Sequence, residues 1–217
     1  GGMTWTNSLG GGGTITIGAG NWNCTATLTN GYNIITVRGT NSSGDATSDS
    51  VTILRLPAGM VCLYDAGVGV TTNASGVVQT WEDLSGNAHT GTAVGTPVVA
   101  LDQLDTKPAV QFRGHDDWLN LAGTFFAKEQ YVVIRSPYSN AWGNYGAFLG
   151  RATGRGSSYM LSVDTTMMWM DQPADAVSKD GTPVPQNRQG NYGYELAPIY
   201  NYMILKIVVN DNDTSAA

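Results

Sequence analysis

The sequence predicts an all-β fold, and three observations support this. Short runs alternate apolar and polar residues, as in residues 110–113, where Val110 and Phe112 face one way and Gln111 and Arg113 the other. Glycine accounts for 28 of 217 residues and charged residues for only 13%, a composition suited to short strands joined by tight turns. No stretch has the sustained periodicity of an amphipathic helix with a charged face.

Residues 1–55 are expected to form a first, short β-sandwich unit. Strands are expected in residues 14–17, 22–28, 34–37 and 50–54, and Asn30-Gly31 is a strong turn signal. This stretch resembles the bacterial immunoglobulin-like modules of surface proteins in residues 5–8, 30–37, 39–44 and 48–53. Such modules have about seven strands in about 100 residues, so the unit is expected to be partial.

Residues 56–59 are expected to be a linker, because Pro57 interrupts strand pairing and Gly59 relieves backbone strain. The second domain, residues 60–217, is then expected to begin with a buried strand at 60–64. A hairpin is expected to join residues 110–113 to 119–121 through the Gly114–Asp117 turn. Further strands are expected in residues 77–81, 131–135, 146–149, 159–163, 167–170 and 202–209, and long loops in 136–145 and 172–196, with a tight turn at 179–181.

The second domain resembles the laminin-G-like group of the concanavalin A-like lectin fold. The matching segments are residues 63–66, 80–87, 107–112 and 114–119. The resemblance implies an antiparallel jelly-roll sandwich that often binds glycans or other surface ligands. It also implies closing strands beyond those in the sequence, so the domain is expected to be incomplete at its C-terminus.

The charge pattern bears on the class of partner. The net charge is −6, with no cluster of Lys and Arg, which argues against nucleic acid as a partner. No apolar run is long enough for membrane insertion, and the composition suggests an extracellular or cell-surface location.

The sequence gives no reason to expect an enzyme. Retaining β-glucanases of this fold need two carboxylates about 5–5.5 Å apart, carried in that family as Glu-x-Asp-x-x-Glu. Glu82, Glu129 and Glu195 do not stand in such a run, and His89 and His115 fall in turn segments outside any recognised catalytic motif.

Aromatic side chains are the best candidates for ligand binding, since sugars stack on exposed rings with polar edges. In residues 118–121 the two leucines are expected to take the core face and the other two side chains the opposite one. The alternative is that the rings pack beneath loops. The candidate ligand-binding residues are Trp118, Asn120, Tyr138, Trp142 and Tyr145.

The candidate cofactor is calcium, which binds carboxylate and amide oxygens. The candidate ligands are Asp83, Asn87, Asp116 and Asp117, with capping of backbone N–H groups as the alternative. Cys24 and Cys62 are either a disulfide or two buried thiols.

Two functions follow from these features. The first is a non-catalytic binding or adhesion module of a bacterial surface or secreted protein that recognises glycans. The second is a structural subunit of a surface assembly or filament, which self-associates because neighbouring subunits complete its open strand edges.

Overall fold

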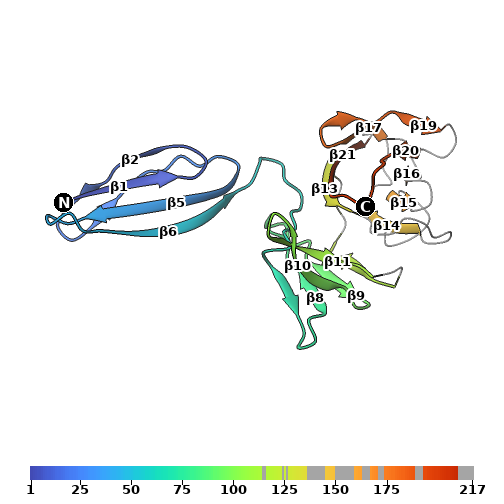
Figure 1. Cartoon of the computed structure of the whole chain (residues 1–217), viewed down its shortest axis with the longest axis horizontal. Helices are drawn as coiled ribbons and strands as arrows, with labels where there is room; N and C mark the ends of the chain where they lie inside the picture. The colour runs from blue at the N-terminus through green and yellow to red at the C-terminus, as the bar shows by residue number, and fades with distance from the viewer. Residues whose placement is uncertain are drawn as a thin grey trace. The chain divides into compact units, whose positions relative to one another are not determined.

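All regular structure among the described residues is β-strand, and the paired strands run antiparallel. The computed structural model describes residues 1–113, 116–123, 125, 127–135, 145–149, 159–162, 167–170, 174–188 and 193–209. The chain divides into two compact units, Gly1–Met60 and Val61–Ala217, drawn in Figure 1 in blue and in green to red. The all-β character predicted from the sequence is confirmed.

The first unit contains one four-stranded sheet, ordered β2-β1-β5-β6, and a short β3-β4 hairpin (Figure 1). Its strands are β1 (Gly2–Asn7), β2 (Gly12–Thr14), β3 (Thr16–Ile17), β4 (Trp22–Asn23), β5 (Gly31–Thr40) and β6 (Ala46–Arg55). β5 and β6 extend well beyond the predicted strands, whereas the strand expected at 22–28 is reduced to β4. β1, which pairs with β5 along its whole length, was not predicted.

Two asparagines make the polar centre of this unit. Asn7 lies at the end of β1 and Asn33 in β5, and both are buried. The Asn7 Nδ2 group donates to Asn33 Oδ1 at 2.9 Å, and Asn33 Nδ2 donates to the carbonyl oxygens of Thr29 and Gly31. Their amides are therefore satisfied by the chain itself, which is the condition for burying them without a large cost.

The first part of the second unit contains a four-stranded sheet, ordered β12-β9-β8-β7, and the β10-β11 hairpin. The strands are β7 (Val70–Thr72), β8 (Val78–Trp81), β9 (Gly91–Val94), β10 (Val98–Leu104), β11 (Lys107–Gln111) and β12 (Trp118–Leu121). β8 matches the strand expected at 77–81. β9 and β10 were not predicted.

The hairpin predicted between residues 110–113 and 119–121 is wrong. β11 pairs with β10, and β12 pairs with β9. The turn between β10 and β11 is formed by Asp105 and Thr106, whose φ angles of 46° and 65° are both left-handed. Two left-handed residues give the type I′ geometry that matches the twist of paired strands.

The strand predicted at 60–64 is also absent, because that segment is held by a loop rather than by a ladder. Leu84 N donates to Leu63 O at 2.8 Å, and Leu63 N donates to Asp83 Oδ1 at 2.9 Å. Ser85 Oγ donates to Val61 O at 2.9 Å. One backbone bond and two side-chain bonds from the loop thus replace strand pairing here.

The rest of the second unit contains two sheets, ordered β13-β21-β17-β18 and β14-β15-β16-β20-β19. The strands are β13 (Glu129–Ile134), β14 (Tyr145–Leu149), β15 (Tyr159–Ser162), β16 (Met167–Met170), β17 (Ala174–Lys179), β18 (Thr182–Pro183), β19 (Gln186–Arg188), β20 (Gly193–Glu195) and β21 (Met203–Val209). β13–β16 and β21 lie where strands were predicted. The long loop expected at 172–196 instead carries β17–β20, although the predicted turn is present, with Asp180 at φ 50° and Gly181 at φ 80°.

The most deeply buried cluster lies in this last part. Its members are between 0% and 3% exposed: Val177, Tyr194, Leu196, Ile199, Met203, Leu205 and Ile207. Lys179 closes one side of it, because its Nζ donates to the carbonyl oxygens of Leu196 at 2.6 Å and Ala197 at 2.9 Å. The charged end of this lysine thus binds carbonyl oxygens of a segment that lies outside the strands.

Candidate binding face

The side chains of β12 alternate as the sequence predicted. Trp118 and Asn120 are exposed, with Trp118 at 45%, whereas Leu119 and Leu121 are half-buried on the opposite face. Gly91 lies directly opposite Leu121, and a Cβ atom on it would come within 3.2 Å of that leucine. The leucines therefore pack closely against β9, and this packing fixes Trp118 and Asn120 on the outer face.

The exposed tryptophan and asparagine act as one unit. Trp118 Nε1 donates to Asn120 Oδ1 at 3.1 Å, which sets both the tilt of the indole and the orientation of the amide. An indole presents an apolar face with a polar edge, and the amide nitrogen beside it is a hydrogen-bond donor. This pair has the chemistry of a sugar-stacking site.

Threonines extend this polar edge across the sheet. The register places Asn120 opposite Thr92 and Thr92 opposite Thr80, and Thr80 is opposite Thr71. Residues directly opposite one another share a face, so these side chains form a row over four strands. The hydroxyl oxygens of Thr71 and Thr80 are 2.6 Å apart, so at least this end of the row is hydrogen-bonded.

We call Trp118, Asn120, Thr92, Thr80 and Thr71 the β12 face. Only Trp118 and Asn120 were predicted from the sequence, because β9 was not recognised as a strand and the threonines are adjacent only through strand pairing. The available signal was a pair of β-branched residues, Thr92 and Val94, spaced two apart in a short segment that ends at Gly95.

The other aromatic candidates do not add to this face. Tyr138 and Trp142 lie outside the described residues. Tyr145 begins β14, where its backbone pairs with Ser162, and its side chain is likewise outside the description.

The Asp83 carboxylate accepts hydrogen bonds from three backbone N–H groups and one hydroxyl. Its Oδ1 accepts from Leu63 N and Ser85 N, both at 2.9 Å, and its Oδ2 accepts from Ser85 Oγ at 2.8 Å and His89 N at 3.1 Å. Capping, the alternative to calcium binding, therefore describes Asp83. Asn87, the second candidate in this loop, donates from Nδ2 to Val61 O at 2.8 Å.

Asp117 has the same role at the open end of the β10-β11 hairpin, where it binds the chain just before β10 and just after β11. Its Oδ1 accepts from Thr96 N at 2.6 Å and its Oδ2 from Arg113 N at 2.8 Å. Asp116 precedes it, with its carbonyl oxygen close to Gly95. Within the part of the chain that the structure describes, no three His, Cys, Asp or Glu residues form a group that could hold a metal ion.

Both cysteines are free thiols, and both are half-buried. Cys24 belongs to the first unit and Cys62 to the second. Burial raises the pKa of the Cys62 thiol, and the nearby Asp83 carboxylate raises it further. Cys62 is therefore a poor nucleophile, since the thiolate is the reactive form.

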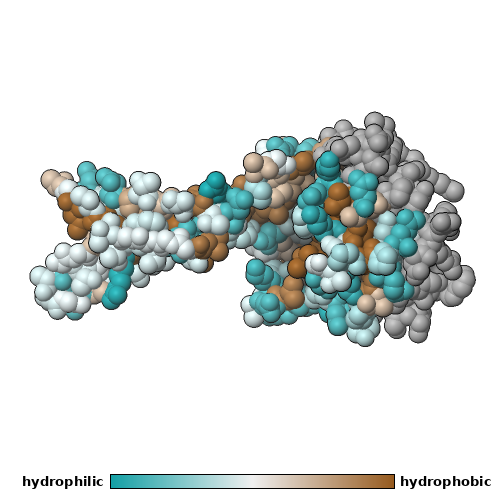
Figure 2. All heavy atoms as spheres, turned by 90° about the horizontal axis from the view of Figure 1, so that it is seen from above, coloured by the Kyte–Doolittle hydropathy of each residue, from teal (hydrophilic) through white to brown (hydrophobic). Residues whose placement is uncertain are grey.

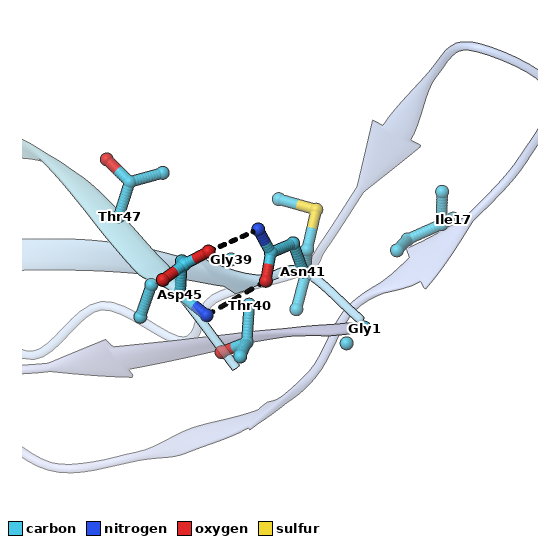
Figure 3. Close-up of a pocket in the computed structure, with 10 residues that line it drawn as sticks. Gly1, Ile17, Gly39, Thr40, Asn41, Asp45 and Thr47 are labelled. Carbon is cyan, nitrogen blue, oxygen red and sulfur yellow. Dashed lines mark hydrogen bonds between the residues drawn. The ribbon is translucent and has the colours of Figure 1, made fainter. Parts of the chain in front are cut away.

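A hollow of about 500 Å³ lies at one end of the first unit and is shown in Figure 3. Its polar groups bind one another: Asn41 Nδ2 donates to Asp45 Oδ2 at 2.9 Å, and Asp45 N donates to Asn41 Oδ1 at 2.8 Å (Figure 3). These bonds close the β5–β6 turn, which is a structural role. The hollow is therefore weaker than the β12 face as a candidate site.

Comparisons with known proteins found no matching family model, no matching curated protein and no matching solved structure. Among the described residues, no helix is long and apolar enough to span a membrane.

Proposed function

We propose that the chain is a non-catalytic binding or adhesion module of a bacterial surface or secreted protein, and that it recognises glycans through the β12 face. The observation that carries this proposal is the exposed indole of Trp118, oriented by its bond to Asn120. The chain would work outside the cell, where such glycans are found. Its architecture would be an immunoglobulin-like unit followed by a laminin-G-like jelly roll, and the antiparallel all-β strands support this.

The chemistry of the face suggests the type of glycan. Its side chains are an indole, an amide and hydroxyls, with no ionisable group among them. Stacking and neutral hydrogen bonds suit neutral sugars with an apolar ring face, whereas a sulfated or sialylated glycan would call for Arg or Lys. The proposed ligand class is therefore neutral glycans.

A glycan array followed by calorimetry on the best neutral oligosaccharide tests this proposal. Replacing Trp118 by Ala should weaken binding about three- to ten-fold, as expected for loss of one aromatic contact. Trp22→Ala is the matched control, because Trp22 is 51% exposed but lies in the first unit. Equal effects of the two substitutions, or no neutral glycan bound on the array, would reject the proposal.

A second function, as a structural subunit of a surface assembly, is favoured by the long exposed strand at the end of the first sheet. All but one of the residues of β6 are exposed, and the strand runs for ten residues at the end of the sheet order. Sedimentation velocity over a range of concentrations tests for self-association of the chain, and a monomer throughout would reject this function.

A further inference from the structure

We propose that two copies of this chain join by antiparallel pairing of their β6 strands about a two-fold axis at Thr52. This inference deepens the second proposed function, because it names the surface, the register and the symmetry of self-association. It is independent of glycan binding.

The outer edge of β6 is open to a partner. No strand in the described part of the chain pairs with that edge. The β5–β6 ladder is continuous, without a bulge, and residues 46–55 contain no Pro or Lys. Natural sheets usually protect an edge by such devices, so this edge is an available template for another strand.

The pairing of β5 with β1 and β6 determines which backbone groups of β6 face the open edge. Ser8 N donates to Ile34 O, so the even-numbered residues of β5 direct their backbone groups to β1 and the odd-numbered ones to β6. Because Ile35 is opposite Val51, the odd-numbered residues of β6 bind β5. The N–H and C=O groups of Ser48, Ser50, Thr52 and Leu54 therefore point to the open edge.

The inner face of β6 carries two apolar side chains that are incompletely covered. Val51 and Ile53 share a face with the buried Ile35 and Asn33, yet they are 54% and 38% exposed. Figure 2 shows brown, hydrophobic patches on the first unit, between paler surfaces of intermediate hydropathy. Two copies joined along β6 would set these side chains against each other.

β6 itself carries two charges, Asp49 and Arg55, and only one register of self-pairing sets them opposite each other. With Thr52 opposite Thr52 of the second copy, the outward backbone groups of Ser50, Thr52 and Leu54 meet. Val51 then faces Ile53, and Asp49 faces Arg55, on both sides of the axis. Pairing about Ser50 instead would set Asp49 against Val51, and pairing about Asp49 would set two aspartates together. The charge at Asp49 would discourage pairing with an unrelated strand, but in this register it lies opposite Arg55 of the second copy.

Arg55 is available for this contact. Its guanidinium donates to Leu28 O within its own chain, which uses one of five N–H donors. Asp49 Oδ1 accepts from Ser50 N at 2.8 Å. In the dimer this N–H would turn to Leu54 O of the second copy, which frees the Asp49 carboxylate for Arg55. Because each copy uses its only β6 edge, the contact closes as a dimer and does not propagate into a filament.

Charge exchange in the full 217-residue chain tests the pairing. Sedimentation should show a dimer for the unaltered protein. Asp49→Arg places two arginines opposite each other, and Arg55→Asp does the same with aspartates, so each variant should dimerise at least ten-fold more weakly. An equimolar mixture of the two variants restores both opposite-charge pairs, and the heterodimer should form. This rescue also shows that both variants fold.

Cysteine scanning tests the register, in a background where Cys24 and Cys62 are replaced by Ala. Thr52→Cys should give a disulfide-linked dimer on mild oxidation, since Cα atoms in a hydrogen-bonded pair are about 5.5 Å apart. Ser48→Cys is the control, because its two copies would be about 27 Å apart in this register.

A monomeric wild type would overturn both the inference and the second function. A dimer unaffected by either charge variant, not rescued by mixing, or linked equally well at both cysteine positions would overturn the inference alone.

Discussion

The Asp83 carboxylate joins two segments twenty residues apart by hydrogen bonds alone. Burial by itself raises the pKa of this group, but the bonds from Leu63 N, Ser85 and His89 N outweigh that effect and leave the pKa below its usual value. The ionised form is therefore the one that the fold stabilises.

Replacing Asp83 by Asn should lower the free energy of unfolding of the second unit by about 1–3 kcal/mol. In the wild type the hydrogen-bond donors are shared between the two carboxylate oxygens of Asp83, whereas the amide of Asn has only one acceptor oxygen. Its NH₂ group would face an N–H or O–H donor. Urea unfolding measures the change. Glu82→Gln is the control, because it removes the same charge from an exposed neighbour and should have little effect.

The same carboxylate predicts an acid limit to stability. The pKa of Asp83 is lower in the folded state than in the unfolded state. Its contribution to the free energy of unfolding is therefore complete above the unfolded-state pKa of about 4, and it is lost as the pH falls through the lower folded-state pKa. Unfolding midpoints of the wild type and Asp83→Asn should therefore converge below pH 4. A difference that stays constant from pH 7 to pH 3 would contradict this account.

At the scale of elements, the side-chain pattern within a strand was predictable from the sequence, whereas the strand with which it pairs was not. The alternation of Trp118–Leu121 depends only on its own four residues, and the structure agrees. The partner of β11 was misassigned because Gly114 and Asp117 resemble a hairpin turn, whereas the actual turn, Asp105-Thr106, has no glycine. Asp117 is used instead to cap Thr96 N and Arg113 N, a long-range choice that no local pattern contains. The threonine row of the β12 face depends on such pairing and was missed for the same reason.

The close approach of Asp117 to the β9–β10 turn makes a prediction for Gly95. Gly95 has φ 83°, and a Cβ atom there would lie 2.3 Å from Asp117 Oδ1 and from Asp116 O. Gly95→Ala should therefore cost well over 1 kcal/mol of stability. Gly76→Ala is the matched control: Gly76 has φ 76° in the β7–β8 turn, with nothing within 4 Å of the added atom. Equal melting temperatures of the two variants would show that the contact with Asp117 is not tight.

At the scale of the molecule, each unit contains its own sheets and its own buried residues. Ile15, Ile35 and the Asn7–Asn33 pair lie in the first unit, and the cluster around Leu205 lies in the second. Because no sheet among the residues that the structure describes draws strands from both units, we expect each unit to unfold as its own cooperative step.

Leu205→Ala tests this independence. Leu205 is 0% exposed within the β21 cluster, so its truncation should destabilise the second unit by about 2–5 kcal/mol. Differential scanning calorimetry should resolve two transitions, of which the substitution shifts only one. Ile204→Ala is the control, because this neighbouring residue of β21 is 51% exposed and should leave both transitions nearly unchanged. Equal shifts of both transitions by Leu205→Ala would show that the two units fold as one.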